Sequence, residues 1–415
     1  MQQNIMMNWS WARPEAGQWP IWRLLALVVL LCYPLMGSRY LPLGGGARYL
    51  SLVAAPLALV LLLRLPLAEM RRELVAALNW SLPFLPFVGV WLLIQAWHQY
   101  SPFDANPLSR LLLTALVFVG ARQVGVRHRH LAWAAALGAV TYALIAGFEV
   151  FIEGRERAWG GVYENRFGQY AAWLTLLCLI HALRAGREGL RRPELAVLIV
   201  GAAAGLFAAL LTGSRGALLA LVVAVFVVLF RSFDWRRVLV LSAALLLALG
   251  VACCLYLPFE ARIVEAVQEV TQYFSEPVFT ATSLGVRLEL ARVALLAMAE
   301  HPWLGTGYTS LAGLYAAHPA LGAMPEALQK VPGFHGDWFQ AMGMGGGALL
   351  LGLLATVAGM AKSAWRDHYR ISLLVCALVF GIGELFLCHK MGLSLLMVCW
   401  ALYAAADQTE RRCEP

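Results

Sequence analysis

Apolar segments of about 20 residues, long enough to cross a bilayer core of roughly 30 Å as helices, recur along almost the whole sequence. In lipid, only helices and closed barrels satisfy all of their backbone hydrogen bonds within the protein. Only 13% of the 415 residues are charged, whereas an ordinary soluble domain is about a quarter charged. The sequence therefore predicts an all-α, polytopic membrane protein.

About twelve membrane-spanning helices are predicted, separated by short breaks rich in Arg or in Gly and Pro. The predicted spans cover residues 20–38, 48–66, 80–98, 107–123, 130–152, 166–184, 194–213, 215–231, 237–257, 340–361, 371–388 and 391–407. We interpret the first as a retained span, because no small-residue cleavage site closes it. Residues 1–415 are therefore expected to form a single membrane domain.

The basic residues indicate the orientation of the spans. If the N-terminus is cytoplasmic, most of the 32 Lys and Arg residues fall in inner loops and tails, as the positive-inside rule requires. Both termini are therefore expected in the cytoplasm. This bias also explains the net charge of +8, so we expect no nucleic-acid partner.

One break is long: residues 258–339, between the ninth and tenth predicted spans, which falls on the outer side. An amphipathic pattern predicts a helix at the membrane surface from about Pro258 to Phe274. A second helix is predicted from Ser283, its expected N-cap, to Glu300. Because long loops on a rigid scaffold often carry function, the site is expected to include this segment.

Two arginines predict an anion site, since guanidinium groups make forked contacts with phosphate. Arg215 lies in the Thr-Gly-Ser-Arg-Gly connection at 212–216 between two spans, and Arg287 lies on the predicted Leu- and Ala-rich helix. The alternative for Arg215 is a side chain that snorkels to lipid headgroups. For Arg292 the alternative to a substrate contact is an ion pair with Glu289, three residues earlier.

His335 is the candidate group for proton transfer, because it lies on the outer side directly before the tenth predicted span. An imidazole can take a proton from a hydroxyl group near neutral pH, or hold that hydroxyl by a hydrogen bond. Asp337 is a candidate to orient the ring. The alternative is a solvated loop histidine without a catalytic role.

Side chains of the predicted loop between the fifth and sixth spans extend the candidate site. Tyr163 and Asn165 can hydrogen-bond sugar or phosphate, and Arg166 follows them directly. Glu384, at an outer span end, is a further functional candidate, although a structural pair with Lys390 explains it equally well. No sequence motif for a metal or a nucleotide phosphate is present, so no cofactor is expected and arginine alone would neutralise phosphate charge.

Together these features resemble the O-antigen ligase family of bacterial inner-membrane glycosyltransferases. The resemblance is carried by the hairpin at 212–216, by the stretch 287–307 ending His-Pro-Trp-Leu-Gly-Thr-Gly, and by the His-centred segment 334–340. It extends from about Arg155 to the last spans. Gly336 stands where many relatives have Asn, so no role of that neighbouring amide is carried over.

The resemblance implies a GT-C-like fold with the 258–339 loop in the periplasm. It also implies metal-independent, inverting transfer of O-antigen from undecaprenyl pyrophosphate to the lipid A core oligosaccharide, with membrane lipids around the protein. By position, Arg215 and Arg287 would hold the pyrophosphate and His335 would activate the acceptor hydroxyl. The expected substrate-binding set is completed by Arg292, Arg166, Asn165, Tyr163 and Asp337.

Three other functions remain open from the sequence: an O-antigen polymerase, a protein O-oligosaccharyltransferase, and a lipid-linked glycan transporter without catalysis. A transporter should carry charged or broken segments near the bilayer midplane. In this sequence the candidate charges gather at the outer boundary, which favours an enzyme working at that surface.

Overall fold

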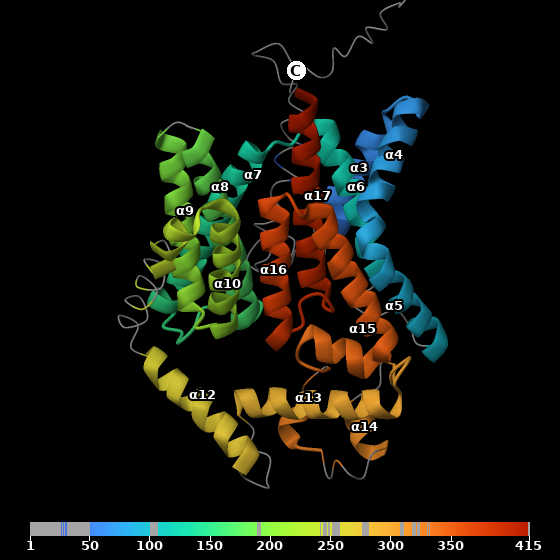
Figure 1. Cartoon of the computed structure of the whole chain (residues 1–415), viewed down its shortest axis with the longest axis vertical. Coiled ribbons are helices and arrows are strands. Elements are labelled where there is room, and N and C mark those ends of the chain that lie inside the picture. Colours follow the sequence, from blue (N-terminus) through green and yellow to red (C-terminus); the bar gives the residue numbers. More distant parts are fainter. Residues whose placement is uncertain are drawn as a thin grey trace, which may run out of the picture.

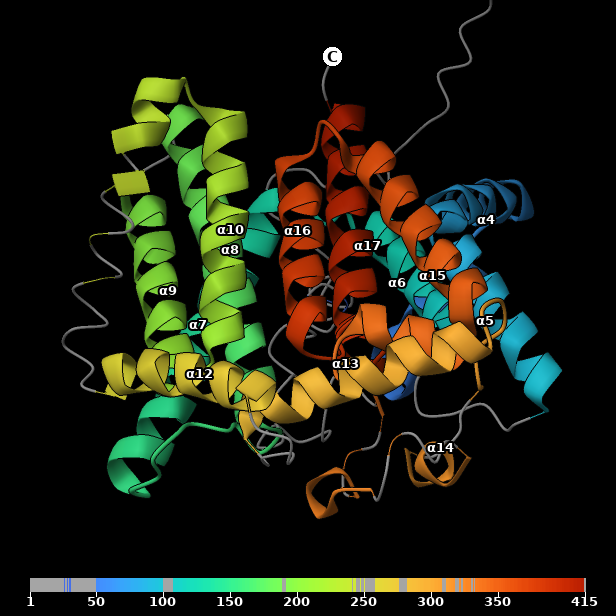
Figure 2. The ribbon, with the colours of Figure 1, turned by 60° about the horizontal axis from the view of Figure 1, so that its bottom comes forward.

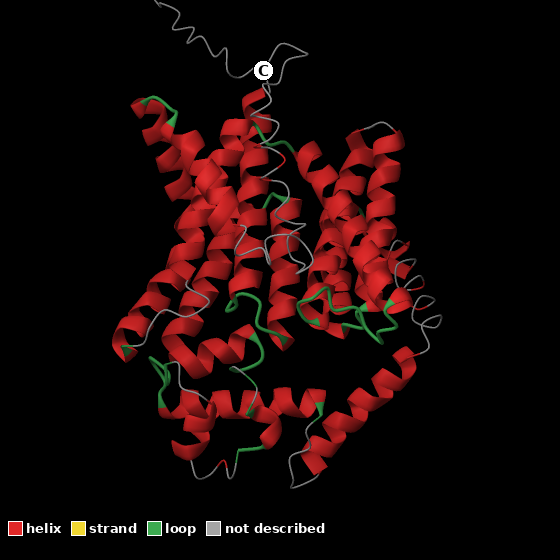
Figure 3. Ribbon diagram, turned by 180° about the vertical axis from the view of Figure 1, so that it is seen from behind, coloured by secondary structure: helices red, strands yellow, loops and turns green. Residues whose placement is uncertain are grey.

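The structure, a computed structural model, is a bundle of long helices with a layer of shorter helices across one end (Figure 1). It describes residues 26, 28, 30, 50–99, 107–188, 192–240, 242–243, 247, 250, 258–275, 282–307, 311–317, 321, 324–329, 331 and 333–413. Over these residues every regular element is a helix, and Figure 3 shows the same from behind. The all-α prediction is therefore confirmed.

The bundle contains the following helices among the described residues. They are α3 (Ala55–Leu63), α4 (Leu67–Ser81), α5 (Leu85–His98), α6 (Pro107–Val124), α7 (His128–Gly147), α8 (Glu164–Glu188), α9 (Arg192–Leu211), α10 (Arg215–Ser232), α15 (Asp337–Ala364), α16 (His368–Gly383) and α17 (Lys390–Cys413). Short helical turns precede α3 (Leu50–Ala54), join α4 to α5 (Leu82–Phe84) and follow α7 (Phe148–Ile152).

The layer across the end is built from α12 (Pro258–Ser275), α13 (Ser283–Glu300) and α14 (Leu311–Ala317), followed by a helical turn at Glu326–Leu328. We call this end of the molecule the loop end; the C-terminal end of α17 lies at the other end (Figure 1). Figure 2 shows α12 and α13 running across the bundle's end. Both helices occupy the ranges that the sequence predicts. The predicted N-cap of α13 is wrong by one residue: the N-cap is Thr282, whose side chain accepts a hydrogen bond from the Gly285 N–H at 3.0 Å.

Seven helical segments of the described residues are long and apolar enough to cross a membrane, so the chain is a multi-pass membrane protein. These segments are Leu67–His98, Pro107–Val124, His128–Ile152, Pro193–Leu211, Arg215–Ser232, Asp337–Ala364 and Lys390–Arg411, with shorter apolar helices at Leu50–Leu63 and His368–Gly383. The predicted spans at 20–38 and 237–257 lie largely outside the described residues. The number of twelve spans therefore stays a prediction.

The helical segment Leu67–His98 begins well before the predicted span 80–98. The sequence places a charged loop there, but Glu73 is only 2% exposed and pairs with Arg122 of α6 at 3.2 Å. Because Glu73 has this buried partner on another helix, a charged residue can lie within the helical segment. Hydropathy alone does not reveal such a partner.

The helix α15 is broken at Gly346, whose φ of +58° is left-handed. The segment 302–307 lies against the break: the Gly347 N–H donates to the Pro302 carbonyl at 2.7 Å, and the Gly307 N–H donates to the Met344 carbonyl at 2.9 Å. A Cβ on Gly346 would lie 2.8 Å from the Gly305 nitrogen, which explains why only glycine fits. The chain that follows α13 is therefore fixed to α15 by backbone hydrogen bonds.

The loop-end layer has a hydrophobic core of its own. Its buried members are Leu290, Val293, Ala294, Ala297, Leu311, Leu314, Tyr315, Leu321, Leu328 and Phe334. On α12, the apolar side chains of Val264, Val267 and Phe274 are exposed, whereas the buried Glu269 carboxylate accepts the Leu284 N–H at 2.8 Å. The layer is thus held together by its own contacts as well as by the packing of α13 on α15.

Candidate functional site

A polar cluster at the loop end is centred on Glu384, the residue that ends α16. One carboxylate oxygen, Oε1, accepts hydrogen bonds from Asn165 Nδ2 and from Arg287 Nη2, both at 2.7 Å. The other, Oε2, lies 3.5 Å from His335 Nδ1, which is longer than an ordinary hydrogen bond. The start of α8, the start of α13, the segment before α15 and the end of α16 therefore meet at one carboxylate.

Arg287 is held in place by two different acceptors. Besides the Glu384 contact, its Nε donates to the Gly383 carbonyl at 3.0 Å. That carbonyl lies at the C-terminal end of α16, where the helix dipole favours a cation. The side chain remains 28% exposed, so its guanidinium is oriented by the protein while a ligand can still reach it.

The hairpin that carries Arg215 is tied to the same cluster through Arg157. Arg157 Nε donates to the Thr212 carbonyl at 2.7 Å, and its Nη2 lies 3.5 Å from Asn165 Oδ1. Arg215 is the first residue of α10, is half-buried, and follows directly on this hairpin. Because α10 packs against α16, the helix that Arg215 begins runs beside the helix that Glu384 ends.

Arg166 and Tyr163 lie beside the cluster at the start of α8. Arg166 Nη1 is 2.7 Å from His389 Nε2, and the guanidinium carbon lies 5.8 Å from the centre of the Tyr163 ring. Tyr163 itself is exposed. The connection from Glu384 to His389 thus receives both Asn165 and Arg166, neighbouring residues of one helix.

Asp337 requires a correction. The sequence suggests that it orients His335 and contacts substrate, but its side chain is fully buried. Its carboxylate accepts three backbone N–H groups, those of Phe386 at 2.9 Å, Leu387 at 2.7 Å and Cys388 at 2.8 Å. Asp337 therefore shapes the connection that follows Glu384, and the carboxylate beside the His335 ring is Glu384.

Arg292 also has a different role from the one predicted. Its Nε and Nη2 donate to the two oxygens of Glu289 at 2.9 and 2.6 Å, so the ion pair that the sequence offered as an alternative is formed. Glu289 also accepts hydrogen bonds from the hydroxyls of Tyr273 on α12 and Tyr315 on α14. This carboxylate joins the three loop-end helices, and Arg292 neutralises it.

The electrostatics of the cluster keep Glu384 ionised. Burial acts to raise the pKa of this carboxyl, but the neighbouring His335 and the Arg287 guanidinium outweigh it and lower the pKa to about 2. A negative charge is thus fixed between an arginine and a histidine. Across the described residues, no group of three or more His, Cys, Asp or Glu side chains could hold a metal ion.

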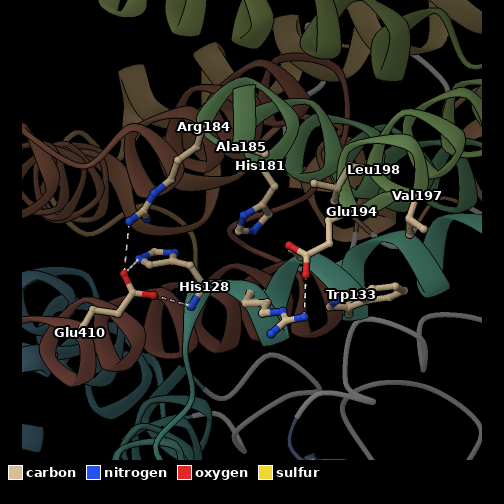
Figure 4. Close-up of a pocket in the computed structure, with 11 residues that line it drawn as sticks. His128, Trp133, His181, Arg184, Ala185, Glu194, Val197, Leu198 and Glu410 are labelled. Carbon is tan, nitrogen blue, oxygen red and sulfur yellow. Dashed lines mark hydrogen bonds and ion pairs between the residues drawn. The ribbon is translucent and has the colours of Figure 1, made fainter. Parts of the chain in front are cut away.

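A cavity of about 130 Å³ lies at the opposite end, between α7, α8, α9 and α17 (Figure 4). Its charges pair with one another: Arg129 with Glu194 at 2.5 Å, and Arg184 with Glu410 at 3.2 Å. Glu410 also accepts the backbone N–H of His128 at 3.0 Å. These contacts join the ends of the helices, and we assign the cavity a structural role.

Sequence reasoning missed the central position of Glu384 and the linking role of Arg157. Glu384 is recognisable from the sequence as a charge at a span end, but neither spacing nor hydropathy identifies its partners or those of Arg157. The alternative pairing that the sequence suggests is with Lys390, six residues away, whereas the observed partner Arg287 is 97 positions away. Long-range partners of this kind appear only when the helices are assembled.

Comparison with known protein families gives a match over part of the chain. Residues 200–357 match the family described as O-antigen ligase, and this segment includes Arg215, Arg287 and His335. Asn165 and Glu384 lie outside the matched segment. No curated protein matches the chain. Through the segment 200–357, the chain is similar to the O-antigen ligase family.

Proposed function

We propose that this protein is a glycosyltransferase that moves O-antigen polysaccharide from undecaprenyl pyrophosphate to the lipid A core oligosaccharide. The observation that carries the proposal is the cluster around Glu384. It gathers Arg287 and His335 directly, and it reaches the hairpin of Arg215 through Asn165 and Arg157. Such a transfer needs an arginine to bind the leaving pyrophosphate and an imidazole to accept the proton of the attacking hydroxyl. Here one carboxylate lies beside both groups.

The donor half of the reaction depends on guanidinium groups. When the bond between the anomeric carbon and the pyrophosphate oxygen breaks, the leaving pyrophosphate gains negative charge. Arg287 is already oriented by Gly383 and Glu384, so it can stabilise that charge without reorganising. Arg215 would contribute the second guanidinium from the start of α10.

Residues at the start of α8 would complete the donor-binding surface. Arg166 lies against the His389 imidazole, which carries no negative charge, so its own positive charge is not cancelled by this contact. Tyr163, which is exposed, and the Asn165 amide, which also donates to Glu384, would hydrogen-bond phosphate or sugar. Arg292 and Asp337 are left out of this set, because their side chains are engaged in structural contacts.

The acceptor half depends on His335. Its Nδ1 faces Glu384, so Nε2 is the nitrogen that would receive the proton of the acceptor hydroxyl. The hydroxyl oxygen then attacks the anomeric carbon on the side opposite the pyrophosphate, the new glycosidic bond forms, and the configuration inverts. The Glu384 carboxylate would stabilise the imidazolium, as the carboxylate of a catalytic triad does.

The proposed topology places the loop end in the periplasm and both chain termini in the cytoplasm. Two observations support it. The helices α12, α13 and α14 lie at the opposite end of the bundle from the C-terminal end of α17, and the short breaks assigned to the inner side are rich in arginine. Residues 258–339 would then be a periplasmic helical segment on the membrane domain of the inner membrane.

Deletion of the gene tests the function. We expect O-antigen to disappear from lipopolysaccharide while long, lipid-linked polymer accumulates. The family match is also compatible with a polymerase, and loss of a polymerase would leave single repeat units on the lipid carrier instead. A transporter would show no transfer when the purified protein is mixed with donor and acceptor in detergent, where no compartments exist.

A further inference from the structure

A groove of about 540 Å³ opens at the loop end, away from the Glu384 cluster. It lies between the end of α5, the end of α13, the segment 302–306 and α14. Its lining residues are Trp97, His98, Glu300, His301, Pro302, Trp303, Leu304, Gly305, Thr306, Gly313 and Leu314. Neither the candidate site nor the transfer chemistry uses any of them.

The floor of the groove is fixed. His98 Nε2 lies 3.1 Å from the Leu304 carbonyl, which connects α5 to the segment 302–306. The Thr306 N–H donates to the Gly343 carbonyl of α15 at 3.1 Å, and its hydroxyl donates to the same carbonyl at 3.0 Å. A ligand would therefore meet a surface that is already ordered, which reduces the entropic cost of binding.

The lining combines large aromatic surfaces with hydrogen-bonding groups. Trp97 and Trp303 are 66% and 70% exposed, an unusual amount for side chains of this size. Glu300 and His301, a carboxylate and an imidazole, also line the groove. Indole rings bind the apolar faces of a ligand while carboxylate and imidazole groups bind its hydroxyls, and a pyranose ring has both kinds of surface.

The charges of the groove argue against a phosphate or a lipid chain as its ligand. The described residues that line it include no Arg or Lys, the side chains that best bind phosphate. A hydrocarbon chain would cover the polar groups of Glu300 and His301 without offering them a hydrogen bond, which is costly. Neutral sugar rings satisfy both requirements.

The helix α13 fixes the groove's distance from the cluster. Arg287 lies in its first turns and Glu300 is its last residue, so at 1.5 Å per residue they are about 20 Å apart along the helix axis. Figure 2 shows this helix lying across the end of the bundle. A chain of a few linked sugars spans such a distance.

We propose that this groove binds neutral pyranose residues of an oligosaccharide substrate, several sugars away from the bond that reacts. This rests on the proposed function, which supplies two oligosaccharides: the acceptor core and the glycan of the donor. Both have the same recognition chemistry, and the kinetic test below distinguishes them.

The test compares the purified full-length protein with Trp303→Ala and Trp97→Ala in a transfer assay with defined donor and acceptor. We expect the KM for one substrate to rise about tenfold, equivalent to the loss of one aromatic contact, while kcat stays unchanged. The substrate whose KM rises is the one bound in the groove. Trp303→Phe should recover most of the loss, because it keeps an aromatic face.

A matched control is Trp235→Ala, since Trp235 is 67% exposed, lies outside the groove and begins the helical segment after α10. If the groove tryptophans only anchor the protein at the membrane surface, all three variants will lower its thermal stability and none will change a KM. That result would overturn the proposal.

A binding measurement separates failure of the site from failure of the function. Core oligosaccharide and O-antigen fragments, both freed from lipid, are titrated into the wild type and Trp303→Ala while tryptophan fluorescence is followed. If the wild type catalyses no transfer but binds a fragment, and Trp303→Ala does not bind it, the sugar site is supported and the transferase proposal is rejected. If the wild type catalyses transfer but binds neither fragment, and the variants have unchanged KM values, the sugar site is rejected and the transferase proposal remains.

Discussion

Glu384 accepts a hydrogen bond from Arg287 Nη2 at 2.7 Å although 97 positions separate the two residues. A carboxylate beside a pyrophosphate-binding arginine weakens the attraction for an anion, so the contact needs a compensating benefit. That benefit is orientation: Glu384 and the neighbouring Gly383 carbonyl together fix both the position and the plane of the guanidinium. The same carboxylate lies beside His335, and thus links the two halves of the proposed reaction.

The first prediction concerns two effects of Glu384: it orients Arg287 and His335, and its negative charge weakens the binding of an anionic donor. In Glu384→Gln the side chain keeps its length but loses its negative charge, so Arg287 and His335 should be less well oriented. We expect kcat to fall about ten- to a hundredfold, while the KM for the donor stays the same or decreases because a repulsive charge is gone. Steady-state transfer with purified substrates measures both constants.

The control for Glu384→Gln is Glu410→Gln. It removes a carboxylate that pairs with Arg184 at 3.2 Å at the other end of the bundle, and it should leave both constants unchanged. An unaltered kcat in Glu384→Gln would show that the carboxylate has no part in the transfer step.

The second prediction compares two arginines of α13. Arg287→Ala should reduce kcat by about two to three orders of magnitude, as removal of one transition-state donor does. Arg292→Ala should stay within a few-fold of the wild type per folded molecule, because this guanidinium is engaged by Glu289. The same assay measures both variants, and equal losses in the two would contradict the assignment of Arg292 to structure.

The sequence reveals elements that depend on local patterns. Helical periodicity and flanking residues predict α13 over the range that the structure shows. The apolar surroundings mark Arg215, in a short hairpin between two spans, and Arg287, on a Leu- and Ala-rich helix. Local patterns do not reveal the break at Gly346, since it depends on carbonyl groups of the segment 302–303, more than forty residues earlier. They also miss the extension of the helix at Leu67, which depends on a buried ion pair with another helix.

In the candidate site, too, the sequence reveals which residue types are present but not which residues contact one another. The presence of His335 could be predicted, but the carboxylate beside it could not. Asp337, two positions away, is the closest acidic residue in sequence, yet as the first residue of α15 it is buried against the backbone of 386–388. Helix assembly, which brings the end of α16 to this point, supplies Glu384 instead.

The third prediction concerns pH. The pKa of Glu384 is lowered to about 2 from an ordinary value of 4.5, so its ion pair stabilises the folded protein fully above about pH 4.5. This stabilisation should be lost progressively as the pH falls from about 4.5 towards 2. The difference in Tm between the wild type and Glu384→Gln, measured in detergent, should therefore be constant above pH 5 and shrink below it.

A difference in Tm that stays constant down to pH 3 would contradict the lowered pKa of Glu384. Glu289→Gln is a useful comparison, because burial acts to raise the pKa of Glu289 but its hydrogen bonds with Arg292, Tyr315 and Tyr273 lower it overall. The same direction of pH dependence is expected there, without the accompanying loss of kcat.

The fourth prediction tests the structural role of Asp337. Asp337→Ala would leave three buried backbone N–H groups without their acceptor, and each such loss costs about 1–3 kcal/mol. We expect a clearly lower Tm and less folded protein, with Asp337→Asn intermediate because it keeps one acceptor oxygen. Asp234→Ala is the control: Asp234 is exposed and accepts the Arg237 N–H at 2.9 Å, so its loss should change the Tm little. A wild-type Tm in Asp337→Ala would show that the three contacts do not stabilise the protein. Because Asp337 shapes the connection that begins at Glu384, we also expect the folded fraction of Asp337→Ala to catalyse transfer more slowly than the wild type.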